Sequence, residues 1–140
     1  MIQNAERPPE GKAPGTGASA PEEAKDEPST LSLAAQAKGE QELERATRSY
    51  EEGAYRNAAR QFQAALDLGL RTKVDQAAAH KYLAFINCVS GREKACRDEF
   101  RKALEVDPGF ELAPAEIGHP IWGPVFRSVK AEAAAKVKAK

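Results

Sequence analysis

The chain has 140 residues, and its 21 lysines and arginines are balanced by 21 aspartates and glutamates. This balance argues against nucleic acid as the main partner, because phosphate binding usually needs a strongly basic face. No stretch approaches the roughly eighteen apolar residues that a membrane-spanning helix requires, so we expect a soluble chain.

The first thirty residues differ in composition from the rest. They hold five of the nine prolines and none of the nine aromatic residues. Such a segment cannot bury enough apolar area to offset the entropy cost of ordering it. We therefore predict a disordered Pro/Ala/Glu-rich tether over residues 1–30. The chain begins without a secretory signal, which leaves two interpretations open: a cytosolic protein, or an exported one whose export segment was removed.

Strong helix formers dominate from about Leu31 onward, and apolar residues recur at spacings of three and four. Glycines and prolines mark the ends of the helices. The pattern predicts four long helices: from about Leu31 to Gly53, from Tyr55 to Gly69, from Val74 to Ser90, and from Ala95 to Asp107. A short helix is expected between Pro114 and Gly118, and a final one from the neighbourhood of Pro120 and Pro124. No run alternates with the period of a strand, so we predict an all-α fold.

Self-comparison reveals an internal repeat. Five residues recur 38 positions later: Gly53, Ala58, Phe62, Ala65 and Leu66 match Gly91, Cys96, Phe100, Ala103 and Leu104. The spacing resembles that of the tetratricopeptide repeat (TPR), whose usual period is about 34 residues. Four extra residues are expected near Leu70–Lys73. A generic four-helix bundle is the alternative.

Two repeats are fewer than such stacks normally need, so the C-terminal segment must cover the open end of the core. We predict a TPR-like domain over residues 31–130 with a C-terminal capping helix, followed by a Lys/Ala-rich tail over residues 131–140 that can project into solvent.

Cys88 and Cys96 lie on either side of the Gly91 turn. An antiparallel hairpin can bring such positions together, so a disulfide is geometrically reasonable. The alternative is two separate buried thiols, with Cys96 replacing the usual alanine. Their spacing does not suit a zinc site.

First helices line the inner face of a TPR stack, which predicts a peptide-binding groove containing Thr47, Tyr50, Lys81 and Phe85. The alternative is that another segment of the chain fills this groove. His119 and Trp122 lie in a Gly/Pro-rich turn and are secondary candidates for partner binding. In the alternative interpretation, Trp122 covers the end of the stack.

Nothing in the sequence favours an enzyme, a cofactor or a metal. Carboxylates are frequent, but no histidine, serine or ligand cluster accompanies them, and His80 is expected to be structural.

Residues 84–104, 107–112 and 118–126 closely resemble a family of small TPR lipoproteins associated with bacterial type VI secretion systems (TssQ type). The most specific features are the Cys-x7-Cys hairpin and the sequence from His119 to Pro124. The resemblance implies attachment to the periplasmic side of the outer membrane through an N-terminal lipid anchor that this chain lacks. It also implies an accessory role beside the envelope complex, with secretion-system proteins as partners, and the oxidising periplasm supports the disulfide.

The sequence therefore predicts a non-catalytic periplasmic adaptor that acts by protein–protein interaction. The alternative is a cytosolic TPR chaperone or regulator that binds a peptide tail and has free thiols.

Overall fold

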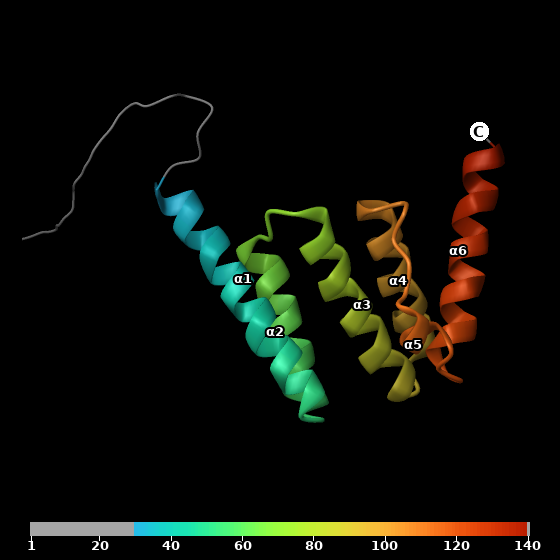
Figure 1. Cartoon of the computed structure of the whole chain (residues 1–140), viewed down its shortest axis with the longest axis horizontal. Helices are drawn as coiled ribbons and strands as arrows, with labels where there is room; N and C mark the ends of the chain where they lie inside the picture. The colour runs from blue at the N-terminus through green and yellow to red at the C-terminus, as the bar shows by residue number, and fades with distance from the viewer. Residues whose placement is uncertain (1–29, 140) are drawn as a thin grey trace, which may run out of the picture. The chain divides into compact units, whose positions relative to one another are not determined.

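The computed structural model describes residues 30–139, and side chains are described for residues 37–137. Within these residues the chain is helical and contains no strand, which confirms the all-α prediction. The predicted tether lies, apart from Thr30, outside the described residues. In chain order the helices are α1 (Thr30–Glu51), α2 (Tyr55–Leu68), α3 (Lys73–Val89), α4 (Glu93–Val106), α5 (Pro114–Ile117) and α6 (Trp122–Ala139) (Figure 1).

The turn between α1 and α2 has the same hydrogen bonds as the turn between α3 and α4. Four backbone bonds close the first turn: Glu52 to Arg48, Gly53 to Tyr50, Ala54 to Ser49, and Ala58 to Ala54. Four bonds close the second turn, each 38 residues later: Ser90 to Ile86, Gly91 to Cys88, Arg92 to Asn87, and Cys96 to Arg92. The two turn glycines have φ values of 84° and 83°, a region that favours glycine because it lacks a Cβ.

The buried side chains also recur at a spacing of 38 residues. Four pairs of positions 38 residues apart are all 0% exposed: Ala46 and Ala84, Ala58 and Cys96, Phe62 and Phe100, and Ala65 and Ala103. Small residues at these positions let the paired helices approach closely, and the phenylalanine of each hairpin fills the space between them. The chain therefore contains two copies of one helical hairpin.

The link between the hairpins contains residues 69–72, where the extra residues were expected. Leu70 is buried there and joins the core of the first hairpin. Thr72 begins α3 as its N-cap, because its side chain accepts a hydrogen bond from the Asp75 N–H.

The C-terminal segment covers the core of the second hairpin. Trp122, Val125, Phe126 and Val129 of α6 are buried together with Phe85 and Phe100. This is the covering role expected of the last helix. The predicted boundary at residue 130 falls inside α6, which continues without a break to Ala139.

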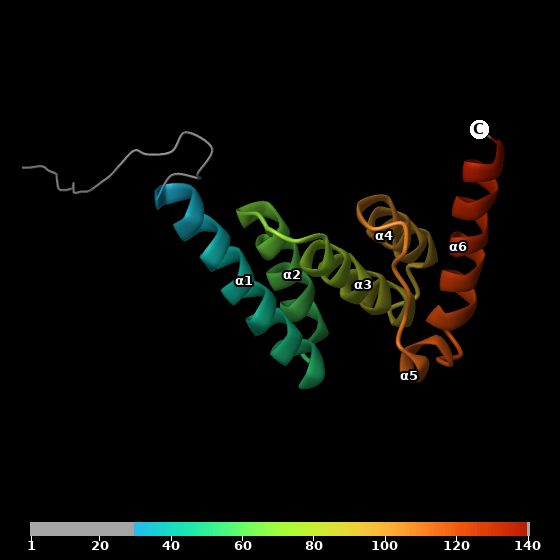
Figure 2. The ribbon, with the colours of Figure 1, turned by 45° about the horizontal axis from the view of Figure 1, so that its top comes forward.

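The direction of α6 differs from that of a continuing array, in which the next helix would run antiparallel to α4. Arg97 bonds to Ser128, and Arg101 bonds to Glu132, each 31 residues further along the chain. This constant offset means that α4 and α6 run parallel. Figures 1 and 2 show why: after α4 the chain returns along that helix to α5 before α6 begins. None of the helices in the described part of the chain is both long and apolar enough to cross a bilayer.

Candidate functional site

Three tyrosines from three helices meet between the two hairpins. The ring centroid of Tyr50 lies 4.9 Å from that of Tyr82 and 5.4 Å from that of Tyr55. The Tyr82 ring also stacks on the buried Phe62, with centroids 5.0 Å apart. Tyr50 and Tyr82 therefore pack against the core of the first hairpin, whereas Tyr55 contacts the Tyr50 ring and is 42% exposed.

The hydroxyl groups of these tyrosines have no hydrogen-bond partner among the side chains and backbone that the structure describes. Within the side chains that the structure describes, no hydrogen bond to a protein atom involves the hydroxyl of Tyr50, Tyr55 or Tyr82. A tyrosine hydroxyl that is partly buried usually has a hydrogen-bond partner. These three groups can therefore bond to water or to another molecule.

Lys81 lies beside the tyrosines and is bound to the C-terminal segment. Its Nζ donates to Glu116 Oε2 at 2.8 Å and lies 4.4 Å from the centre of the Tyr82 ring. The other carboxylate oxygen of Glu116 accepts the backbone N–H of Ala113. Lys81 thus connects the second hairpin to α5 through its ion pair with Glu116, while its ammonium group also lies over the ring of Tyr82 in its own helix. We call the surface made by Tyr50, Tyr55, Tyr82 and Lys81 the tyrosine face.

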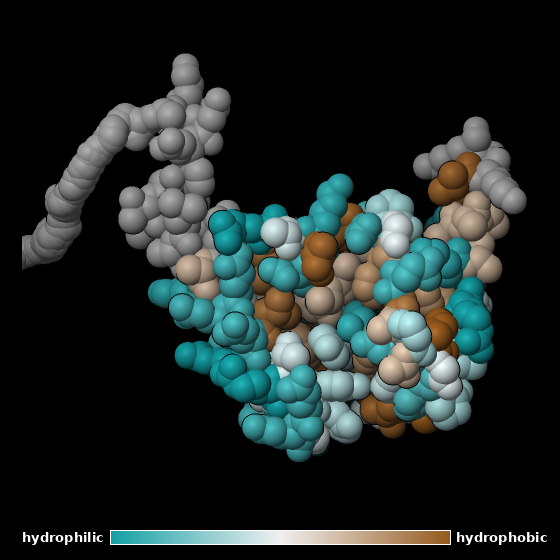
Figure 3. All heavy atoms as spheres, viewed as in Figure 1, coloured by the Kyte–Doolittle hydropathy of each residue, from teal (hydrophilic) through white to brown (hydrophobic). Residues whose placement is uncertain are grey.

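The surroundings of Tyr50 favour its neutral form. Burial raises the pKa of Tyr50 to about 12, and the charges that Tyr55, Tyr82 and Glu116 can carry act in the same direction. Tyr50 therefore keeps its hydroxyl proton to a higher pH than an ordinary tyrosine does. Figure 3 shows hydrophobic residues gathered between the hydrophilic surface of α1 and the C-terminal segment.

The structure brings the four predicted groove residues into different environments. Tyr50 and Lys81 belong to the tyrosine face. Thr47 uses its hydroxyl within its own helix, because Oγ1 donates to the Leu43 carbonyl at 2.9 Å. Phe85 does not line an open groove, which corrects the sequence prediction. It is 1% exposed, and Trp122 stacks on its ring with centroids 3.9 Å apart.

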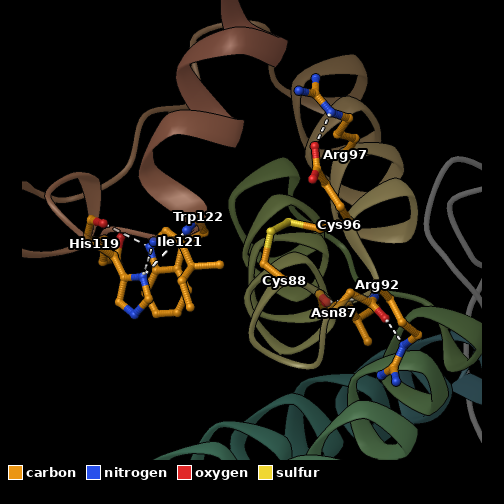
Figure 4. Close-up of a disulfide and its surroundings, with 11 residues drawn as sticks. Asn87, Cys88, Arg92, Cys96, Arg97, His119, Ile121 and Trp122 are labelled. Carbon is orange, nitrogen blue, oxygen red and sulfur yellow. Dashed lines mark hydrogen bonds and ion pairs between the residues drawn. A yellow bond between two sulfur atoms is a disulfide. The ribbon is translucent and has the colours of Figure 1, made fainter.

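The turn before α6 explains the burial of Phe85. The His119 ring stacks on Trp122, with centroids 3.5 Å apart (Figure 4). Phe85 stacks on Trp122 as well. Trp122 is 8% exposed, and its indole N–H donates to the Glu116 carbonyl. Because Trp122 is buried, it covers the core and does not present a free ring to a partner.

His119 also begins α6. Its Nδ1 accepts the backbone N–H of Ile121 at 3.1 Å, and the Trp122 N–H lies 3.5 Å away (Figure 4). The free N–H groups of a helix start need such acceptors. The secondary candidates His119 and Trp122 thus form a structural turn.

Cys88 and Cys96 are joined by a disulfide between α3 and α4 (Figure 4). The structure accordingly agrees with the paired interpretation of the two cysteines. The bond lies in the core of the second hairpin, next to Phe100. At the equivalent positions of the first hairpin are Tyr50 and Ala58, so only the second hairpin carries this cross-link.

Sequence reasoning did not include Tyr55, Tyr82 or Glu116 in the site. Tyr55 and Tyr82 recur with the apolar residues of their helices, and this periodicity gives no signal that part of each ring stays accessible. Glu116 pairs with Lys81 across 35 residues, and no local pattern indicates such a contact. His80 links α3 to α4, because its Nδ1 lies 2.8 Å from Glu99 Oε1.

Among the described residues, no three histidine, cysteine or acidic side chains are grouped as metal ligands would be. In the comparisons with known proteins, no family model, no curated protein and no solved structure matches the chain.

Proposed function

We propose that the protein is a non-catalytic adaptor built from two TPR-like hairpins that binds a partner protein through the tyrosine face. The observation that carries this proposal is a contiguous group of three tyrosines, two of them packed against the core, whose hydroxyls have no described protein partner. Tyrosine provides a large contact area at low entropy cost and a polar tip for hydrogen bonds. These properties suit a protein–protein interface.

The repeated hairpin supports the TPR-like part of the proposal. The turn bonds and the buried positions agree at a shift of 38 residues, and stacked helical hairpins commonly act as binding surfaces. The C-terminal segment fills the second hairpin's part of the inner face. Binding is therefore expected at Tyr50, Tyr55 and Tyr82, where the first hairpin meets the second.

The proposed location is the periplasmic side of the outer membrane, beside the envelope complex of a type VI secretion system. This part rests on the resemblance of residues 84–126 to the secretion-associated lipoproteins. The disulfide supports it, because disulfides persist in the periplasm and are rare in the cytosol.

Site-specific photo-crosslinking in the producing bacterium tests the proposal. A photoreactive phenylalanine analogue replaces Tyr55 in one strain and Arg60, an exposed residue of α2 that lies outside the tyrosine face, in a matched control. We expect a covalent adduct with one envelope protein at position 55 and none at position 60.

A second variant separates binding from folding. Replacing Tyr50 and Tyr82 together by phenylalanine keeps the packed rings and removes only two hydroxyls. The adduct at position 55 should weaken while the thermal unfolding temperature stays close to that of the parent. Equal adducts at positions 55 and 60, or an adduct that the double phenylalanine variant leaves unchanged, would refute the proposed face.

A further inference from the structure

Glu116 lies beside the tyrosine face, and both of its carboxylate oxygens are used there. Oε2 accepts a hydrogen bond from Lys81 Nζ at 2.8 Å, and Oε1 accepts the backbone N–H of Ala113 at 2.9 Å. The backbone carbonyl of Glu116 accepts the indole N–H of the buried Trp122, also at 2.9 Å. The turn before α6 therefore holds this carboxylate against Lys81.

Water reaches this ion pair only in part. The side chain of Lys81 is 14% exposed and that of Glu116 is 23% exposed. A partly buried ammonium group without a counter-ion is costly, and the nearby Tyr82 ring attracts it without supplying a full negative charge. Lys81 therefore needs an anion at this position, and the chain itself provides one.

Without Glu116, the tyrosine face would have the donors of an anion-binding site. Its ammonium group and its three tyrosine hydroxyls are all groups that can donate hydrogen bonds to a carboxylate. The charge of Glu116 acts on these donors: burial is the main cause of the raised pKa of Tyr50, and Glu116 contributes in the same direction. A partner carboxylate placed at Lys81 would therefore meet a like charge and an ammonium group that is already paired, and both disfavour its binding.

We propose that Glu116 determines the specificity of the tyrosine face: it acts as an internal ligand of Lys81 and excludes acidic segments, so that the partner binds through a segment without carboxylates. This inference rests on the proposed function, because it concerns which segment binds at that face. Specificity of this kind comes from an unfavourable contact with the wrong partner, in addition to the favourable contacts with the right one.

Selection of random peptides displayed on phage, with the 140-residue chain as bait, tests the proposal. Glu116→Gln keeps an oxygen for the Ala113 N–H but removes the negative charge opposite Lys81. Glu111→Gln is the matched control, because Glu111 belongs to the same segment but pairs with Lys130. We expect the peptides selected on Glu116→Gln to be more acidic than those selected on the wild type, and those selected on Glu111→Gln to match the wild type.

Fluorescence anisotropy then measures how tightly the acidic peptides bind. They should bind Glu116→Gln about tenfold or more tightly than they bind the wild type, as expected for one hydrogen bond to a charged group. Adding Lys81→Gln to Glu116→Gln should remove this gain, because the ammonium group that attracts the carboxylate is then absent. Thermal unfolding should show that all variants stay folded, since each exchange conserves the approximate size of the side chain.

Two outcomes would overturn the role of Glu116. One is that the wild type and Glu116→Gln select peptides of the same charge. The other is a gain in affinity that persists when Lys81→Gln is added, because the gain would then not come from the freed ammonium group. Neither outcome changes the crosslink expected at position 55, so a failure of this inference can be distinguished from a failure of the proposed function.

Discussion

Reduction of the disulfide should weaken the domain by an amount that the chain length between the cysteines sets. Cys88 and Cys96 are separated by eight positions, so the bond closes a short loop. In the chain-entropy model, a loop of this length contributes about 2.5 kcal/mol to the free energy of unfolding. Domains of this size are stable by only about 5–15 kcal/mol, so the loss would be a substantial part of the total.

Urea unfolding followed by circular dichroism measures this effect. The wild type is unfolded with and without a reductant, and the two free energies of unfolding are compared. The variant Cys88→Ala/Cys96→Ala is the control, because the reductant should not change its stability. Since the reduced wild type retains both sulfur atoms, the comparison isolates the cross-link from the packing.

Two results would refute this reasoning. One is a difference of less than about 1 kcal/mol between oxidised and reduced wild type, which would mean that the loop is already ordered in the unfolded state. The other is the titration of two free thiols in native protein purified without a reductant. That second result would also favour the cytosolic alternative over a periplasmic adaptor.

Three further predictions follow from the packing. Phe100→Ala should reduce the free energy of unfolding by about 3–5 kcal/mol, because the ring is fully buried against two other rings; a loss below about 1 kcal/mol in urea unfolding would contradict this. Tyr50→Cys with Ala58→Cys should form a second disulfide, because these positions correspond to the natural pair; a mass that shows no loss of two hydrogens under oxidising conditions would argue against equivalent hairpins. The free energy of unfolding should fall as the pH rises from about 10 towards 12, because the unfolded chain loses the Tyr50 proton before the folded chain does. In urea unfolding at these pH values, the free energy of unfolding of Tyr50→Phe should fall less steeply with pH than that of the wild type. Identical slopes would refute the raised pKa of Tyr50.

Local signals in the sequence were sufficient to predict the helices and the repeat. Gly53 and Gly91 end the first helix of each hairpin because the chain turns there with positive φ. Pro114 begins the short α5, and Pro124 lies in the first turn of α6, where a missing N–H costs nothing. The burial of Phe62 and Phe100 follows from the same periodicity, because each lies one turn after a small residue on the packed side of its helix.

The composition of the inner face depended on contacts that no local pattern specifies. Phe85 was expected in an open groove, but Trp122, 37 residues later, stacks on it. The ion pair between Lys81 and Glu116 likewise joins α3 to a residue of the segment after α4. Both contacts exist because the segment after α4 first returns along that helix, so that α6 runs parallel to it.

The sequence by itself determined which segments are helical and where the turns between them lie, and that one hairpin occurs twice, because these properties depend on residues within one or two turns of each other. The end of α6 at Ala139 was not among these properties. Only the tertiary structure decided which surface remains open. The direction of α6 depends on the burial of Trp122, Phe126 and Val129 against residues far away in the chain. This direction of α6 covers the core of the second hairpin and leaves Tyr50, Tyr55 and Tyr82 partly accessible where the two hairpins meet.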